Sequence, residues 1–162
     1  MAKNKEEKTN VMRVLEQKKI AYTAHSYPHE EGVAVDGVTV AKSMGFDPAQ
    51  VFKTLVARGA SGQYYVFDVP VAESLDLKKA AKAVGEKSIE MLHQKELLPL
   101  TGYVHGGCSP VGMKKQFPTV FHETAAQYDT VCVSAGRIGA QVECRPGDLI
   151  ALLRAKTADI IV

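Results

Sequence analysis

Two apolar segments joined by a short glycine turn constrain the fold of this chain more than any other feature. VFKTLVAR covers residues 51–58, QYYVFDVPV covers 63–71, and GASG at 59–62 separates them. β-Branched and aromatic residues dominate both segments, which is typical of buried strands, and a glycine-rich turn between two such runs indicates a hairpin. The sequence therefore predicts an antiparallel pair of central strands.

Shorter predicted elements surround this hairpin. Further strands are predicted at 20–27, 88–91, 119–122, 130–134, 140–144 and 159–162. Helices are predicted at 9–19, 38–44, 77–84, 94–98 and 146–153. Ser74 or Asp76 is expected to cap the third helix with Leu77 facing inward, and Pro99 is expected to stop the fourth. Because the strands follow one another in hairpins, the pattern predicts a single α+β domain with a mixed or mainly antiparallel sheet.

Composition supports one globular domain and excludes other classes of chain. The 162 residues are 46% hydrophobic and 23% charged, which is ordinary for a folded domain and excludes a disordered chain. With 20 basic and 18 acidic residues, the formal charge of +2 is too weak to diagnose a nucleic-acid binder. A polyanionic ligand would therefore need a local basic patch.

Leader, membrane and disulfide signals are not found. Residues 1–8 are polar and predicted to be flexible, and no apolar stretch follows them as it would in a signal peptide. Cys108, Cys132 and Cys144 are odd in number and form no CxxC pair, which argues against a disulfide framework. No apolar run approaches the ~20 residues that span a bilayer. We therefore expect a reduced, cytoplasmic protein.

A lysine inside the first strand of the hairpin is the most informative single residue. Lys53 lies among apolar residues on both faces of the strand, with only Thr54 as a polar neighbour. Such a lysine either loses water, which lowers its pKa, or points into a wet cleft where a bound anion raises it. The alternative is a lysine that snorkels at the end of a strand. The pattern alone leaves both interpretations open.

The glycine-rich segment GYVHGGCSPVG provides the second candidate feature. Gly106 and Gly107 let the backbone approach a ligand closely, and successive amides in such a turn can bind an anion or an oxyanion. The alternative is a tight structural turn. Cys108 in the same loop is a candidate nucleophile, with His105 or His122 as its base.

Other clusters give weaker signals. No group of histidines, cysteines and carboxylates has metal-ligand spacing, so no metal or other cofactor is predicted. Five lysines could form a rim that contacts phosphates. They are Lys78, Lys79, Lys82, Lys114 and Lys115. A solvated helix face explains the first three of them equally well.

Four segments, taken in order, resemble the YbaK/EbsC family. They are GVTVAKSMG at 37–45, VFKTLV at 51–56, LKKAAK at 77–82 and GGCSPVG at 106–112. Members of this family are bacterial deacylases of mischarged Cys-tRNA(Pro), similar to the editing domain inserted in bacterial prolyl-tRNA synthetases. The resemblance runs from about Thr9 to the C-terminus. It implies one editing domain over residues 9–162, with helices around a curved, barrel-like sheet.

The resemblance also implies a set of site residues. It places a pocket between Lys53 and a GxxxP loop that matches Gly106 to Pro110. The substrate-binding residues that it implies are Tyr27, Thr54, Cys108, Ser109, Pro110 and Asp148. Relatives can carry a bulky residue near Asp36, where this chain has an aspartate. They can also carry an aliphatic residue at the position of Cys108, and this weakens the case for Cys108 as a nucleophile.

The chemistry that the resemblance implies needs little from the protein. The thiol of the mischarged cysteine attacks its own ester, releases the tRNA and leaves a thiolactone that water opens. An intramolecular nucleophile of this kind reaches an effective molarity of about 10⁵ M or more. Lys53 would hold the reacting end by charge, while amides of the Gly106–Pro110 loop, from Gly107 to Ser109, would bind the oxyanion. The predicted partners are mischarged tRNA(Pro) and prolyl-tRNA synthetase, with neither a membrane nor DNA.

Three alternatives stay open at this point. The first is a deacylase of Ala-tRNA(Pro), in which water is the nucleophile. The second is a module without catalytic activity that binds a tRNA terminus or a nucleotide in the same pocket. The third is a cysteine hydrolase that acts through Cys108.

Overall fold

The expected hairpin forms the middle of the larger of two sheets. The computed structural model describes residues 8–162, so the predicted flexible N-terminus lies almost entirely outside the described residues. The hairpin strands pair antiparallel, with Thr54 opposite Asp68. The sheet has the order β4-β2-β3-β5-β8, and its strands β3, β5 and β8 run parallel. Its members are β2 (Phe52–Gly59), β3 (Tyr64–Pro70), β4 (Ile89–Met91), β5 (Thr119–His122) and β8 (Lys156–Ala158).

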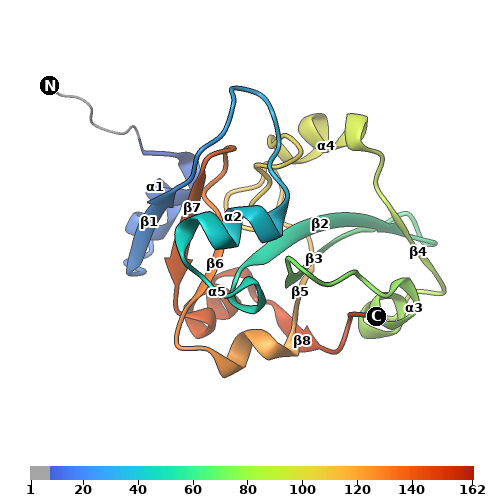
Figure 1. Cartoon of the computed structure of the whole chain (residues 1–162). Helices are drawn as coiled ribbons and strands as arrows, with labels where there is room; N and C mark the ends of the chain where they lie inside the picture. The colour runs from blue at the N-terminus through green and yellow to red at the C-terminus, as the bar shows by residue number, and fades with distance from the viewer. Residues whose placement is uncertain (1–7) are drawn as a thin grey trace, which may run out of the picture.

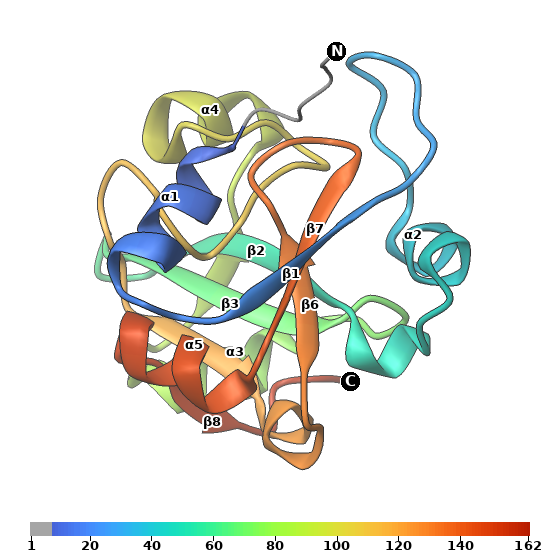
Figure 2. The same cartoon turned by 90° about the vertical axis from the view of Figure 1, so that its left-hand side faces the viewer.

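A smaller antiparallel sheet packs across the first one (Figures 1 and 2). It has the order β1-β7-β6, with β1 (Tyr22–Ser26), β6 (Val131–Ser134) and β7 (Ala140–Cys144). A single bridge between Val51 and Cys132 links the two sheets. The predicted α+β domain with a mixed sheet is therefore confirmed, with the strands divided between two sheets that do not close into a barrel.

Short helices cover the edges and outer faces of these sheets (Figure 1). They are α1 (Asn10–Gln17), α2 (Gly37–Met44), α3 (Leu77–Val84), α4 (Gln94–Thr101) and α5 (Pro146–Leu153), with 3₁₀ turns η1 (Pro48–Gln50) and η2 (Glu123–Gln127). Thr9, Asp36 and Asp76 each accept a hydrogen bond from the first turn of the helix that follows, as N-caps do. No helix within residues 8–162 has the length and apolar character to cross a membrane.

The hydrophobic core is divided between the two faces of the hairpin. Phe52, Val56 and Val66 point to the main core, which lies between the sheets and is completed by α1 and α5. Phe67 and Val69 point the other way, toward a smaller core under α3. Successive residues of a strand face opposite sides, so Thr54 and Asp68 fall on the side of the main core.

Three details of the sequence prediction are wrong. Leu77 is 41% exposed, because the first turn of α3 overhangs an open hollow instead of the core. The fourth helix continues through Pro99, whose fixed φ is compatible with helix and whose missing hydrogen bond falls on the exposed Lys95. The last strand is Lys156–Ala158, ahead of the predicted 159–162, and only a bridge from Ile161 to Leu75 follows it.

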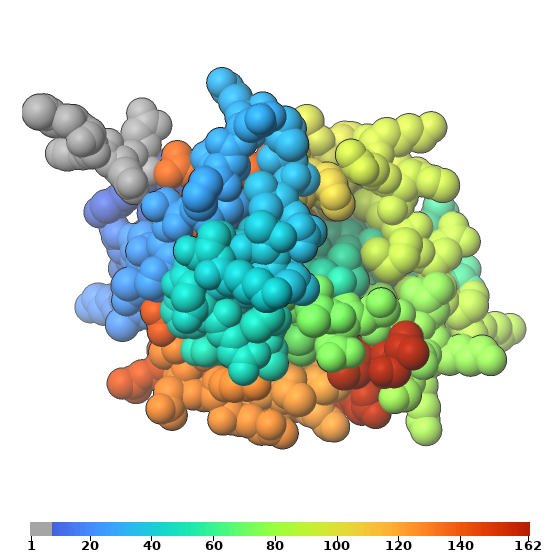
Figure 3. Space-filling model, in the orientation of Figure 1, coloured from blue at the N-terminus to red at the C-terminus, as the bar shows by residue number. Residues whose placement is uncertain are grey.

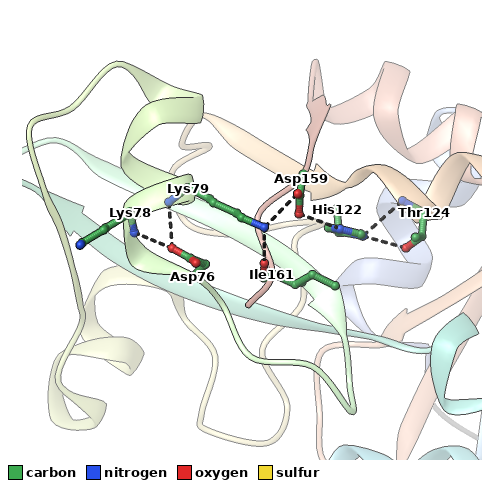
Figure 4. Close-up of polar contacts among 7 residues, drawn as sticks. All are labelled: Asp76, Lys78, Lys79, His122, Thr124, Asp159 and Ile161. Atoms are coloured by element: carbon green, nitrogen blue, oxygen red, sulfur yellow. Dashed lines mark hydrogen bonds and ion pairs between the residues drawn. The ribbon is translucent and has the colours of Figure 1, made fainter.

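A polar network ties α3 to the C-terminal segment (Figure 4). The Lys79 Nζ donates to Asp159 Oδ2 and to the Ile161 carbonyl, both at 2.9 Å. His122 lies on the other side of Asp159, with its Nε2 3.5 Å from Asp159 Oδ1 and its Nδ1 2.9 Å from the Thr124 hydroxyl. The network fixes the end of the chain against the sheet.

Candidate functional site

A cavity of about 430 Å³ opens on one side of the hairpin. Its walls come from four distant parts of the chain: the loop before α2, the first half of β2, the glycine-rich loop, and the facing ends of β6 and β7. In Figure 3 the hollow lies between the blue loop that leads into α2 and the yellow region of α4, with β2 at its back. It joins Tyr27, Lys53, Thr54, Gly106 and Cys108, five of the residues predicted for the site.

The cavity floor is an open edge of β2. β4 pairs only with Ala57–Gly59, at the far end of β2, and the bridge to β6 lies at Val51, so no described strand pairs with the edge between them. Five consecutive residues from Val51 to Leu55 consequently line the cavity, although their side chains alternate between two faces. Lys53 and Thr54 reach the same cavity from this edge.

Lys53 is half-buried, which is compatible both with a cleft lysine and with a snorkelling one. Burial lowers the pKa of its ammonium group, while the negative charge of Glu73 acts in the opposite direction. A lysine in this setting is a ready partner for an anion, because a bound negative charge would replace the water that the ammonium group has lost.

Glycine is required in the loop because neighbouring segments lie against it. Gly106 has φ +91°, and a Cβ atom there would lie 2.6 Å from the Cβ of Ala34. A Cβ on Gly107 would lie 3.0 Å from the backbone of Arg137 and Ile138, in the turn between β6 and β7. The loop therefore packs between the segment before α2 and the turn that joins β6 to β7, and a larger residue would displace one of them.

The loop amides differ in their availability. The Gly107 amide donates to the Val104 carbonyl at 2.9 Å, so it belongs to the turn itself. Among the described residues, the amides of Gly106 and Cys108 have no hydrogen-bond partner, and both residues line the cavity. The unpaired amides at the cavity are therefore those of the residues on either side of Gly107, whereas the sequence interpretation names the amides from Gly107 to Ser109.

Ser109 and Pro110 lie on the buried side of the loop, away from the cavity. Both are buried, neither lines the cavity, and the Ser109 hydroxyl accepts a hydrogen bond from the Val111 amide at 3.3 Å. Their position indicates that they hold the loop in shape, which is the role expected of a proline without an amide hydrogen.

Thr54 and Tyr27 provide hydroxyl groups at the cavity. The Thr54 hydroxyl donates to Asp68 Oδ1 at 2.6 Å. Tyr27 is 5% exposed, and its backbone amide donates to the Gly139 carbonyl at 3.0 Å, which anchors it beside the turn between β6 and β7.

Cys108 lies in the cavity wall but is poorly suited to act as a nucleophile. Burial, with a further contribution from the charge of Asp68, raises the pKa of its thiol to about 12. The thiol is therefore protonated at neutral pH, and a thiolate is the reactive form. His122, one of the two candidate bases, is engaged by Thr124 and Asp159. His105 does line the cavity.

The remaining predicted residues lie elsewhere. Asp148 is in the first turn of α5 and is not among the residues that line the cavity. None of the five lysines of the predicted rim lines it either, within the described part of the chain. Lys79 is bound to the C-terminal segment, and Lys114 Nζ lies 3.3 Å from the Pro99 carbonyl.

Sequence reasoning did not single out three polar residues at this site. Ser134 and Gln141 face the cavity from the ends of β6 and β7, and the buried Gln141 Oε1 has no partner among the described residues. Nothing in their short strands marks them. Asp68 lies behind Thr54, and it carried a usable signal: it is a charged residue in the middle of the apolar run QYYVFDVPV.

Comparisons with known proteins converge on one family. The model of the aminoacyl-tRNA editing domain matches residues 32–152. A protein of Enterococcus faecalis named "Putative Cys-tRNA(Pro)/Cys-tRNA(Cys) deacylase EbsC" is 45% identical over 161 residues, covering 99% of this chain and 98% of the relative.

Solved structures share the fold. One, described as "a putative trans-editing enzyme for prolyl tRNA synthetase", is 28% identical with a TM-score of 0.83, over 94% of this chain and 95% of that chain. Another, described only as a hypothetical protein, is 21% identical with a TM-score of 0.84, over 95% of this chain and all of that one. At that identity the second likeness supports the fold alone.

Proposed function

Because the chain belongs to the aminoacyl-tRNA editing domain family, we propose that it is a trans-editing deacylase that removes cysteine mischarged onto tRNA(Pro). The observation that carries this proposal is that Lys53 and the glycine-rich loop line the same cavity. The 45% identity to a relative named for deacylation of Cys-tRNA(Pro) and Cys-tRNA(Cys) supports the choice of the cysteinyl ester. A tRNA substrate also assigns the activity to the cytoplasm, where aminoacyl-tRNAs are used.

The proposed nucleophile is the thiol of the substrate. Its sulfur bonds to the ester carbonyl carbon, the bond from that carbon to the ribose oxygen breaks, and the ribose oxygen takes a proton. Water then opens the thiolactone to free cysteine. The Cys108 thiol at the cavity is buried and protonated, so a thiol carried by the substrate fits the site better than this cysteine as the nucleophile. Proximity alone supplies an effective molarity of about 10⁵ M or more.

The protein in this proposal positions the ester and stabilises charge. Lys53 binds the terminal nucleotide or the reacting end through its ammonium group and favours the thiolate form of the substrate. The Gly106 and Cys108 amides are the candidates for binding the oxyanion. Tyr27 and Thr54 orient the aminoacyl ribose. Gly107, Ser109 and Pro110 keep the loop in the conformation that presents these amides.

The deciding experiment compares three esters with one enzyme. Deacylation of Cys-tRNA(Pro), Ala-tRNA(Pro) and Cys-tRNA(Pro) with a methylated thiol would be measured side by side. Rapid loss of the unmodified cysteinyl ester alone is the expected result. Faster loss of the alanyl ester, or undiminished loss of the methylated one, would replace the substrate thiol by water as nucleophile. Binding of all three without turnover would leave only a binding module.

Selection of the tRNA is the second part of the proposal. With a net charge of +2 the chain is not a strong reader of tRNA, so prolyl-tRNA synthetase is the proposed source of tRNA(Pro) selection. Sedimentation of the chain with the synthetase and tRNA(Pro) tests this, and a ternary complex is expected. Equal deacylation of Cys-tRNA(Cys), with no such complex, would show that the chain acts on the cysteinyl ester regardless of the tRNA.

A further inference from the structure

A buried carboxyl group lies directly behind the floor of the cavity, and the proposed chemistry gives it no role. Asp68 is completely buried on β3, between the apolar Phe67 and Val69. Its Oδ1 lies 2.6 Å from the Thr54 hydroxyl oxygen, within hydrogen-bond distance, whereas its Oδ2 has no partner within residues 8–162. Burying a polar group with half of its hydrogen-bonding capacity unmet is unfavourable, and valine would suit this strand better.

The strand register ties this carboxyl group to the site. Thr54 and Asp68 are direct cross-strand partners, so their side chains lie on the same face of the hairpin. Thr54 lines the cavity and Asp68 does not. Thr54 is therefore the cavity-lining residue to which Asp68 is hydrogen-bonded.

The state of the carboxyl group decides what that hydroxyl can do. A threonine hydroxyl has one proton to donate and two lone pairs to accept with. An ionised carboxylate only accepts, so it keeps the Thr54 proton and leaves lone pairs facing the cavity. A neutral carboxyl group donates its own proton to Thr54 Oγ1, and the Thr54 proton is then free to point into the cavity.

We propose that Asp68 is a positioning residue of this site, whose neutral carboxyl group donates to Thr54 and so directs the Thr54 hydroxyl proton toward an oxygen of the bound aminoacyl ribose. The proposal rests on the deacylase function proposed above. Burial favours the neutral form, since it raises the pKa of Asp68 to about 8, against the opposing effect of the Thr54 hydrogen bond.

The groups around Asp68 do not change their own charge over the pH range in which Asp68 titrates. Cys108 is the titratable group that faces it from the glycine-rich loop, and the raised pKa of that thiol keeps it neutral while Asp68 titrates. Phe121 lies opposite on β5 and is apolar. Lys53 pairs with Val69, on the other face of the hairpin.

The test combines Asp68→Val, Thr54→Val and the double variant in measurements of kcat/KM for Cys-tRNA(Pro) and of the melting temperature. Each single variant is expected to lose about 5- to 10-fold in kcat/KM, the worth of one hydrogen bond, and the double variant is expected to lose no more. Asp68→Val should melt no lower than the wild type, because it removes an unsatisfied buried group. Thr119→Val, which removes another buried hydroxyl from the same sheet away from the cavity, is the matched control and should keep its activity.

A pH profile provides the readout that a purely structural role would not change. Asp68→Asn supplies a permanent donor, so it should restore most of the activity at about pH 7. Between about pH 7 and about pH 9 the activity of the wild type relative to this variant should fall as Asp68 ionises. Losses that add in the double variant, a ratio independent of pH, or full activity of Asp68→Val would each overturn the proposal.

Failure of the proposed function would look different. In that case the wild type itself would not deacylate Cys-tRNA(Pro). The same variants would then be compared for binding 3′-cysteinylamino-3′-deoxyadenosine, which cannot be hydrolysed. Weaker binding by both single variants, with no further loss in the double variant, would support the role of Asp68, and unchanged binding would refute it.

Discussion

Lys53 is the residue on which the proposed chemistry depends most directly. Its half-buried ammonium group is on the cavity floor, where it can hold the charged end of a substrate. Lys53→Ala is expected to lower kcat/KM for Cys-tRNA(Pro) by about 100-fold or more, the scale of losing one preorganised electrostatic group. Lys42→Ala removes an exposed lysine outside the cavity and serves as the control. Equal rates for both variants, at limiting and at saturating tRNA, would exclude Lys53 from the mechanism.

Gly106 offers a second test at the scale of one residue. Gly106→Ala forces a side chain onto φ +91° and against Ala34, whereas Gly62→Ala meets the same backbone strain, at φ +93°, in open space. Both variants are expected to lose about 1 kcal/mol or more of unfolding free energy, measured by urea denaturation. Only Gly106→Ala should also lose deacylation, because only its substitution moves the loop. Retained activity in Gly106→Ala would argue against an oxyanion site in this loop.

A residue whose chemistry conflicts with its surroundings gives the clearest signal in the sequence. Lys53 stands out because an ammonium group is out of place in an apolar strand, and Asp68 could have been found by the same argument. Ser134 and Gln141 could not, because a polar residue at a strand end is ordinary and only tertiary structure brings it to the cavity. Asp148 was predicted from family resemblance, and the structure places it in α5, away from the cavity lining.

At the scale of elements, the start of α3 provides a direct test of capping. The Asp76 side chain accepts hydrogen bonds from the amides of Lys78 and Lys79, at 2.9 and 3.0 Å (Figure 4). Asp76→Ala is expected to lower the free energy of unfolding by about 1 kcal/mol, measured by urea denaturation. Ser74→Ala, at the other position that the sequence allowed for the cap, should have no effect. Equal losses in the two variants would contradict this assignment.

Local elements and the central hairpin were predictable, whereas the pairing of strands distant in sequence was not. The hairpin of β2 and β3 follows from two adjacent apolar runs, and Gly45 and Gly85 end their helices in the left-handed conformation that glycine favours. The parallel pairing of β3 with β5 and of β5 with β8 joins strands that are distant in sequence, and no local pattern specifies it. The open edge of β2, which creates the cavity floor, depends on that tertiary arrangement.

The free energy of unfolding of the whole molecule should depend on pH through the ionisation of Asp68. The folded chain raises its pKa from 3.8 to about 8, so the folded state binds a proton more tightly than the unfolded state does. Protonated Asp68 therefore makes its full contribution to the free energy of unfolding below about pH 4, and this contribution is lost as the pH rises toward about 8. Asp68→Asn should remove this dependence. The check is urea denaturation of both proteins across that range, and parallel pH profiles would contradict the prediction.

The pairing of β1 with β7 has a consequence for folding during synthesis. Tyr22 lies opposite Cys144, so β1, which is synthesised early, can pair only after β7 has been synthesised near the end of translation. Chains leave the ribosome N-terminus first. A nascent chain carries Lys53 long before the ends of β6 and β7 can complete the cavity around it. Editing by this protein should therefore start only after its own translation is nearly finished, with no partly active form on the ribosome.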